Sequence, residues 1–190
     1  MQRIIFTIIK FFRYRSCLKK PEFTVDQIIL LNLEYLKQKN ILALILDFDG
    51  VLGSHGKLQP LPEVVEWLER AVQIFGPKKI FVLSNNPLAS RRDFFEQYFN
   101  NQIEFIIAKP KPNLEGIITI FNDLLLFGSI EKSQVLLIDD RLATGILAAK
   151  IFGIASCLIM KPYVNLRGNW IKELFFMFLR KLERIIVWHL

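Results

Sequence analysis

The stretch Ile41-Leu42-Ala43-Leu44-Ile45-Leu46-Asp47-Phe48-Asp49-Gly50-Val51-Leu52 decides how this chain folds. Six apolar residues in a row predict a strand that is buried on both faces, as in a parallel sheet. Ligands of such sheets bind beyond the carboxyl ends of the strands, where Asp47 and Asp49 lie. Two carboxylates this close repel each other unless a cation or a shared proton relieves them. The stretch therefore predicts a divalent-metal site with an acid/base partner; the alternative is an acidic turn after a strand.

Composition gives a first indication of the partner. The 190 residues suffice for one domain with a sizeable core, 52% of them are hydrophobic, and the net charge is +7. Because basic residues are mixed with Ile and Phe, we expect an anionic membrane surface as partner and no nucleic acid. No uncharged apolar run is long enough for a transmembrane helix. Cys17 and Cys157 have no metal or redox spacing, which is typical of a reducing compartment.

Both ends of the chain have amphipathic patterns. Residues 2–15 predict a basic helix that lies on a membrane interface, with packing on the core as the alternative. Thr24 and Gln27 resemble a capping box and predict a second helix over 25–39. Residues 170–190 predict a final helix with aromatic residues even among its charges. The apolar arcs contain Ile4, Ile5, Ile8, Ile9, Phe11 and Phe12 in the first helix, and Ile171, Leu174, Phe175, Phe178, Leu179, Leu182, Ile185 and Ile186 in the last.

Strands and helices alternate between these ends. Apolar runs predict four further strands, at 79–84, 103–107, 135–139 and 154–160. Together with 41–46 they predict an α/β fold with a doubly wound parallel sheet. We expect N-terminal amphipathic helices over 1–40, a catalytic domain over 41–160 and a C-terminal amphipathic helix over 161–190.

Polar residues follow several of these strands in a known order. The run from Asp47 to Leu52 resembles motif I of the haloacid dehalogenase (HAD) superfamily, an apolar run followed by D-x-D-x-T/V. Ser84-Asn85 after the next strand resembles motif II, in which a hydroxyl and nearby amides hold a phosphoryl oxygen. In isolation, Ser-Asn-Asn-Pro is also an ordinary turn. Little chain is left for a cap domain, so the resemblance implies a capless member with an open site.

Motif III is a lysine, often followed by proline, whose ammonium offsets the negative charge of nucleophile and phosphate. Two lysines compete for this place. Lys109 fits the K-P-x-P form, and Lys111 fits an A-K-K-P form and aligns better with the following helix. The sequence leaves both open.

Motif IV supplies acids that complete a Mg²⁺ site, usually as G-D-x-x-x-T-D. Here Asp139 stands in the Gly place, Asp140 in the ligand place, Thr144 in the Thr place, and Gly145 replaces the second Asp. It stays open whether Asp139 takes over the missing carboxylate.

Within the superfamily the chain resembles subclass IIIA, which holds YqeG-type proteins and mitochondrial phosphatidylglycerophosphate phosphatases. The resemblance implies hydrolysis of a phosphomonoester through an aspartyl-phosphate, with Asp47 as nucleophile and Asp49 as acid/base. Mg²⁺ would be held by Asp47, the Asp49 carbonyl and Asp140, with Asp139 nearby. Ser84, Asn85 and one of the two lysines would bind phosphate. His55, in the loop after motif I, is interpreted as a solvated residue.

Three functions remain open at this point. The first is a lipid phosphatase of phospholipid and cardiolipin biosynthesis, peripheral on the inner membrane of a bacterium or in the mitochondrial matrix. The second is a soluble phosphatase for a nucleotide, a sugar phosphate or a nucleic-acid 3′-phosphate, since Asp139-Asp140-Arg141 resembles the D-D-R of polynucleotide 3′-phosphatases. The third is a non-enzymatic membrane-bound scaffold. The intact D-x-D disfavours the scaffold, and the amphipathic ends favour the lipid enzyme.

Overall fold

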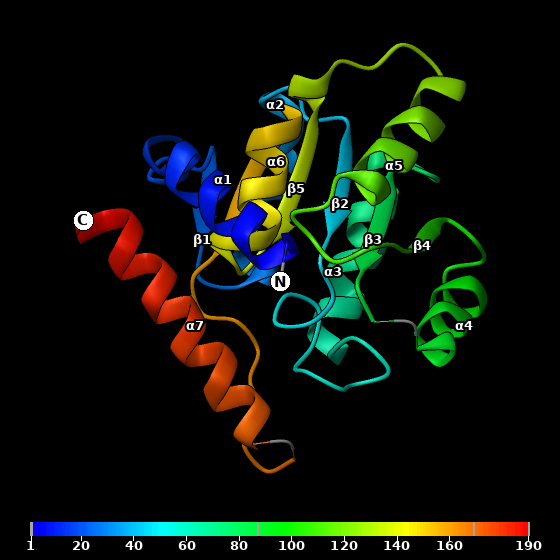
Figure 1. Cartoon of the computed structure of the whole chain (residues 1–190). Helices are drawn as coiled ribbons and strands as arrows, with labels where there is room; N and C mark the ends of the chain where they lie inside the picture. The colour runs from blue at the N-terminus through cyan, green and yellow to red at the C-terminus, as the bar shows by residue number, and fades with distance from the viewer. Residues whose placement is uncertain (1, 87, 169, 190) are drawn as a thin grey trace.

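A parallel sheet of six strands forms the centre of the protein. The computed structural model describes residues 2–86, 88–168 and 170–189, apart from the side chains of residues 2–4 (Figure 1). The strand order is β1-β6-β5-β2-β3-β4, with every neighbouring pair parallel. The predicted α/β class is therefore confirmed, and all five predicted strands are present. The strands are β1 (Phe23–Val25), β2 (Ala43–Leu46), β3 (Ile80–Ser84), β4 (Ile103–Ile107), β5 (Val135–Asp139) and β6 (Ala155–Ile159).

Helices cover both faces of this sheet. One core cluster joins α2, α3, α4 and the short helix η1 (Ile28–Leu30) to the sheet, and a second joins α5 and α6 to its other side. A 3₁₀ turn, η2 (Lys132–Gln134), leads into β5, and a π-helical turn, η3 (Leu142–Ile146), leads into α6. The α-helices are α1 (Gln2–Leu18), α2 (Leu33–Gln38), α3 (Pro62–Phe75), α4 (Ala89–Tyr98), α5 (Glu115–Leu126), α6 (Leu147–Phe152) and α7 (Trp170–His189).

The prediction of one helix over 25–39 is wrong. Thr24, the expected capping residue, lies in β1, which pairs with β6 at the edge of the sheet. Helix α2 begins only at Leu33, where the side chain of Asn32 accepts a hydrogen bond of 2.7 Å from the backbone N–H of Tyr35. A three-residue strand is too short for a periodic pattern, so pairing with β6 decides its conformation.

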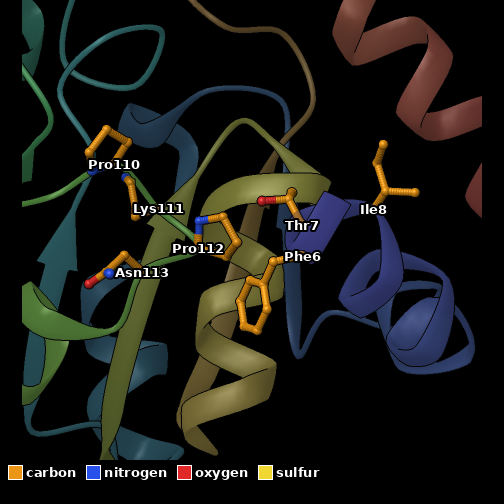
Figure 2. Close-up of a pocket in the computed structure, with 7 residues that line it drawn as sticks. All are labelled: Phe6, Thr7, Ile8, Pro110, Lys111, Pro112 and Asn113. Atoms are coloured by element: carbon orange, nitrogen blue, oxygen red, sulfur yellow. The ribbon is translucent and has the colours of Figure 1, made fainter. Parts of the chain in front are cut away.

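The first helix has the predicted amphipathic form but is only partly packed. Phe11 and Leu18 are buried in a cluster with Val187 of α7, whereas the apolar residues of the amino-terminal half are largely exposed. That half reaches the loop before α5, where Phe6 and Pro112 line a common groove (Figure 2). The side chains of Arg3 and Ile4, which belong to the predicted arcs, lie outside the described residues.

The last helix packs on the protein with its charged face, whereas an amphipathic helix usually buries its apolar face. It buries three charged residues, Glu173, Arg180 and Glu183, and only one apolar residue, Val187. Most of its predicted apolar arc faces outward instead, although Ile186 packs partly on the cluster that contains Val187. The helix runs along the side of the domain near α1 and ends at His189; Leu190 lies outside the described residues (Figure 1).

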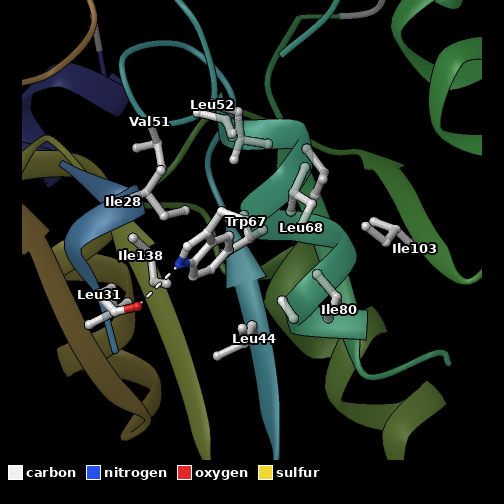
Figure 3. Packing of buried hydrophobic residues seen from close by; sticks show 14 of the residues in the cluster. Ile28, Leu31, Leu44, Val51, Leu52, Trp67, Leu68, Ile80, Ile103 and Ile138 are labelled. Atoms are coloured by element: carbon white, nitrogen blue, oxygen red, sulfur yellow. Dashed lines mark hydrogen bonds between the residues drawn. The ribbon is translucent and has the colours of Figure 1, made fainter. Parts of the chain in front are cut away.

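The largest core cluster holds the amino-terminal segment onto the sheet (Figure 3). The indole N–H of Trp67 in α3 donates a buried hydrogen bond of 3.1 Å to the Leu31 carbonyl, beside η1. In the sheet beneath, β2 lies between β3 and β5, and the strand order reverses at this point. In open parallel sheets this reversal leaves a crevice at the carboxyl ends of the central strands. Residues that directly follow β2, β3 and β5 therefore meet there.

Candidate active site

The catalytic candidates gather at the carboxyl ends of β2 and β5. The backbone N–H of Asp47 donates to the Ile138 carbonyl at 3.0 Å, which places Asp47 beside the end of β5. The ammonium of Lys111 lies 2.6 Å from Asp47 Oδ1 and 2.5 Å from Asp139 Oδ2. One buried cation thus joins the acids of both strands.

The position of Asp139 bears on the question left open at motif IV. A Cβ atom at Gly145 would lie 2.0 Å from Asp139 Oδ2 and 2.2 Å from its Cγ. The Asp139 carboxylate therefore fills the space that a side chain at 145 would need. Its other oxygen, Oδ1, accepts the Arg141 backbone N–H at 2.9 Å. The Asp139 carboxylate thus lies beside Gly145, where the motif usually has its second acid.

Asp140 meets the last helix. Its Oδ2 accepts a hydrogen bond of 2.5 Å from Arg180 Nε, and both side chains are buried. Gly50 makes this approach possible, because it has φ of +90° and an added Cβ would lie 2.5 Å from Asp140 Oδ2. Within the described residues, Arg180 Nη1 is buried without a hydrogen-bond partner. Such an orphaned donor costs about 1–3 kcal/mol, so its presence calls for a ligand or a function.

Three carboxylates here are able to hold a metal ion. One oxygen from each of Asp47, Asp139 and Asp140 lies within 4.8 Å of the other two. An all-oxygen donor set of this kind fits a hard cation such as Mg²⁺ or Ca²⁺. The side chain of Asp49 is directed elsewhere. The cluster therefore comprises Asp47, Asp139 and Asp140, and of the residues expected at the metal only the Asp49 side chain is not part of it.

The electrostatics of the cluster favour a cation. Burial raises the pKa of Asp47 to about 8; Lys111 opposes this rise, while Asp139 and Asp140 add to it. Burial also raises the pKa of Asp140 to about 6, against the opposing effect of Arg180. Burial disfavours the charged form of Lys111, but Asp139 and Asp47 raise its pKa above the ordinary value. A divalent ion would relieve the repulsion among the acids and displace their protons.

Asp49 is held by an arginine that sequence reasoning missed. Arg91 of α4 is fully buried and donates to both carboxylate oxygens, at 2.7 Å to Oδ1 and 3.1 Å to Oδ2. Its guanidinium lies 3.8 Å from the centre of the Phe48 ring and also donates to the Lys57 carbonyl. This bidentate pair fixes the plane of the Asp49 carboxylate at the rim of the site.

The two candidate lysines are separated by the fold. Lys111 is buried in the site, as described above. Lys109 is half exposed and pairs with Glu115 at 2.7 Å, outside the cluster of acids. Ser84 is buried at the end of β3, and its Oγ accepts the Asn86 backbone N–H at 3.2 Å. Asn85 and Asn86, not Ser84, line the cavity.

A cavity of about 310 Å³, hereafter the catalytic cavity, opens over these residues. Its walls come from distant parts of the sequence. Residues that follow β2, β3 and β5 contribute, and so does α7 near the end of the chain. The lining residues are Asp47, Asp49, His55, Asn85, Asn86, Lys111, Asp139, Asp140, Arg141, Thr144, Lys172, Phe176 and Arg180.

The interpretation of His55 as a solvated residue is wrong. Its Nδ1 lies 3.0 Å from Glu173 Oε2, its backbone N–H donates to Glu173 Oε1 at 3.0 Å, and its ring stacks on Phe176 at 4.2 Å. Burial lowers the pKa of His55, although Asp49 and Glu173 oppose the effect. The loop after motif I is thus fastened to α7, a contact between residues 118 positions apart.

Glu183 makes a third charged contact between α7 and the site. It accepts hydrogen bonds from the Arg141 guanidinium and, at 3.2 Å, from the Ala143 backbone N–H. The arginine of the Asp139-Asp140-Arg141 run is therefore held by α7. The amphipathic pattern of α7 predicts an apolar and a charged arc, but the pattern alone does not tell which arc faces inward.

Comparison with known proteins places this geometry in a family. The model of the mitochondrial PGP phosphatase family matches residues 3–164. The chain belongs to this family. It is therefore a phosphatase of the phosphatidylglycerophosphate (PGP) phosphatase and YqeG type, as the motifs predicted. A relative is the probable phosphatase YqeG of Bacillus subtilis, which is 26% identical over 140 residues, or 74% of this chain and 76% of YqeG. No solved structure matches the chain.

The family match ends before α7. Phosphatase activity follows from the matched span, which contains Asp47, Asp49, Lys111 and the Asp139-Asp140 pair. The residues that α7 contributes to the catalytic cavity lie beyond it. Among the described residues, no helix is both long and apolar enough to cross a membrane.

Proposed function

We propose that this chain is a Mg²⁺-dependent phosphatase that removes the terminal phosphate of phosphatidylglycerophosphate at a membrane surface. The observation that carries the proposal is the orientation of α7. Its charged face closes one side of the catalytic cavity, and its apolar face is turned outward. A membrane that covers this apolar face would bring the cavity bordered by α7 close to the lipid headgroups.

Two helices supply the outward apolar surface. The exposed apolar side chains of α7 are 40–65% accessible, and those of α1 are 49–60% accessible. The two helices contact each other, because the Trp188 indole N–H donates to the Lys19 carbonyl at 3.4 Å and Val187 packs with Phe11. The surface comprises Ile5, Phe6, Ile8, Ile9 and Phe12 of α1, and Trp170, Ile171, Leu174, Phe175, Met177, Phe178, Leu182 and Ile185 of α7.

The energetics favour an anionic membrane over water for this surface. Complete burial of one large apolar side chain contributes about 1.5–3 kcal/mol, and a monomeric soluble protein rarely leaves so many together. Each basic residue near an anionic leaflet adds about 1 kcal/mol. Such residues lie on both helices: Lys10, Arg13 and Arg15 on α1, and Lys181 on α7.

The reaction that we propose uses the two motif I acids. A carboxylate oxygen of Asp47 attacks phosphorus in line, the bond from phosphorus to the glycerol oxygen breaks, and Asp49 gives that oxygen a proton. Asp49 then takes a proton from water, whose oxygen attacks the aspartyl-phosphate and frees Asp47 and inorganic phosphate. Arg91 orients Asp49 through one hydrogen bond to each carboxylate oxygen. When Asp49 is protonated, one of its oxygens still accepts from Arg91, so proton transfer needs the loss of only the other hydrogen bond.

The remaining residues of the cavity bind charge. Lys111, between Asp47 and Asp139, offsets the negative charge that the phosphate brings, and Asn85 and Asn86 offer donors for its oxygens. Mg²⁺ held by Asp47, Asp139, Asp140 and the Asp49 carbonyl would supply electrostatic stabilisation of the transferring phosphoryl group. Ser84 supports the loop through Asn86.

The family match and the apolar surface together support a place of action at a membrane. A peripheral enzyme of this kind would work on the inner membrane of a bacterium or on the matrix side of a mitochondrial membrane. Phospholipid and cardiolipin biosynthesis is the process that such a product, phosphatidylglycerol, would serve.

A panel of phosphate-release assays tests the proposal. Phosphatidylglycerophosphate in anionic vesicles is compared with phosphatidic acid, a nucleoside monophosphate and 3′-phosphorylated DNA, each with Mg²⁺ and with a chelator. We expect the first lipid to give the highest kcat/KM and the chelator to abolish release. Asp47→Asn is the control for contaminating phosphatases. Preference for the nucleotide or the DNA end would overturn the lipid assignment while leaving the phosphatase family intact.

A further inference from the structure

A second cavity lies along α7 and shares Arg180 with the catalytic cavity. It has a volume of about 560 Å³ and is formed by α7 and the segment that follows β6. We call it the α7 groove. Its lining residues are Met160, Pro162, Val164, Met177, Arg180, Lys181, Arg184, Ile185, Trp188 and His189.

Arg180 belongs to the walls of both cavities. Its Nε is engaged with Asp140 in the catalytic cavity, and its Nη1 is buried with no hydrogen-bond partner in the described part of the chain. A guanidinium holds its donors in one plane and pairs bidentately with carboxylates and phosphates. A buried, partly unsatisfied guanidinium between two cavities is therefore suited to an anion that spans them.

The groove carries more positive charge than Arg180 alone. Arg184 is one helical turn further on, about 6 Å along the axis, and Lys181 is exposed beside it. Arg184 donates to the carbonyls of Ile159 and Met160 at 3.2 and 2.9 Å, which anchors it at the groove. Burial lowers the pKa of Arg184, and the neighbouring Arg180 adds to this effect. An anion in the groove would offset both the burial of the Arg184 charge and its repulsion by Arg180.

The other walls of the groove are apolar. Met160, Pro162 and Val164 face Met177, Ile185 and Trp188, so a row of cations borders a hydrophobic floor. The exposed apolar surface of α7 continues directly from it through Met177 and Ile185. A ligand with an anionic group next to a hydrocarbon chain matches this combination better than an inorganic anion or a sugar phosphate does.

We infer that the α7 groove binds the phosphodiester group and the adjoining acyl region of the lipid substrate while its terminal phosphomonoester lies at Asp47. This inference rests on the proposed function and deepens it, because it assigns the recognition of the second phosphate to residues that the family match does not contain. Lys181 and Arg184 are then specificity-determining residues, and Arg180 contacts both ends of the headgroup.

Charge-removing variants of the groove test the inference. Lys181→Gln and Arg184→Gln remove one cation each outside the catalytic cavity, and Arg167→Gln removes one from the exposed loop before α7 as a matched control. We expect KM for phosphatidylglycerophosphate in mixed micelles to rise about 10-fold in each groove variant, with kcat changed less than about 2-fold. Hydrolysis of p-nitrophenyl phosphate, which has no second phosphate, should be unchanged in all three.

A binding measurement separates this inference from the proposed function. Dihexanoyl phosphatidylglycerol below its micellar concentration offers the diester without a monoester, and its affinity for each variant is measured by titration calorimetry. We expect about 10-fold weaker binding in the groove variants and wild-type affinity in Arg167→Gln. If the wild type hydrolyses no lipid yet shows this pattern, the function falls and the groove site stands.

Three results would overturn the groove site. The first is no binding of dihexanoyl phosphatidylglycerol to the wild type. The second is unchanged KM and unchanged affinity in Lys181→Gln, which removes an exposed side chain and decides the matter if Arg184→Gln does not fold. The third is an equal loss in Arg167→Gln, which would mean that the lipid responds to surface charge and not to a defined site.

Discussion

Helices α3 and α7 are both amphipathic, yet they turn opposite faces to the protein. Helix α3 buries Val64, Trp67 and Leu68 against the sheet and exposes its glutamates. Helix α7 buries Glu173, Arg180 and Glu183 and exposes its aromatic and aliphatic residues. The pattern fixes two faces, but what lies beneath the helix decides which one is inside. Beneath α3 lies an apolar core; beneath α7 lie charges of an active site.

Removal of the nucleophile should give the largest effect. Asp47→Asn keeps the shape of the side chain but removes the attacking oxygen, so we expect turnover to fall at least about 10⁴-fold with no loss of secondary structure. Phosphate release and circular dichroism are measured together. Undiminished turnover would mean that the charges of α7 surround a site with another function.

The two lysines before α5 should differ strongly. Lys111→Met leaves Asp47 and Asp139 buried beside each other without their shared cation, so we expect kcat to fall about 10²- to 10³-fold. Lys109→Met, which removes only an exposed pair with Glu115, should change kcat less than about 2-fold. Single-turnover phosphate release compares them. Two equally small effects would remove Lys111 from the mechanism.

Truncation of apolar residues should separate α3 from α7 directly. Leu68→Ala in α3 creates a cavity in the core and should lower the free energy of unfolding by about 2–5 kcal/mol. Leu174→Ala in α7 removes an exposed side chain and should change it by less than about 0.5 kcal/mol. Urea unfolding of both variants, without lipid, gives the two values. If Leu174→Ala lowered the free energy of unfolding by as much as Leu68→Ala, the Leu174 side chain would be buried in solution.

The pH dependence of the metal-free protein should reveal the strained acids. The folded chain retains protons on Asp47 up to about pH 8 and on Asp140 up to about pH 6, whereas the unfolded chain loses them near pH 4. The folded state thus binds more protons in this window, so stability should fall as pH rises, by up to about 1.4 kcal/mol per unit for each retained proton. Mg²⁺ affinity should rise over the same range, because binding displaces protons.

Urea unfolding with and without Mg²⁺ between pH 5 and 8.5 checks this slope. Asp140→Asn should reduce it at the acidic end of the range. Stability that rises with pH throughout would contradict the account of the cluster.

Most of the fold follows from local pattern, whereas part of the site does not. Apolar runs ending in acids located β2 and β5, and the motif spacing located Asp47, Asp49 and Asp140. Lys111 could not be distinguished from Lys109 because both precede proline in one loop, and only the path of that loop brings Lys111 to the acids. The sequence left the role of Asp139 open, because only the folded chain brings its carboxylate into the space beside Gly145.

Long-range contacts account for the other omissions. Arg91 reaches Asp49 across 42 residues and Glu173 reaches His55 across 118, and neither pair leaves a local signal. Strand β1 was missed for the same reason, since pairing with β6 decides it. A helix with equally clear apolar and charged arcs, such as α7, is predictable as a helix but not in its orientation.

The most direct test of the account is a comparison of one enzyme on two substrates after its outward surface has been made polar. Phe175→Ser combined with Phe178→Ser changes α7, and Leu126→Ser combined with Phe127→Ser changes an equally exposed pair at the end of α5, beside Lys78, which precedes β3. Hydrolysis of phosphatidylglycerophosphate in anionic vesicles and of p-nitrophenyl phosphate in solution is measured for both. The account predicts at least about a 10-fold loss of kcat/KM on vesicles for the α7 variant alone, with the soluble substrate unaffected. Equal losses on both substrates, or no loss on vesicles, would contradict it.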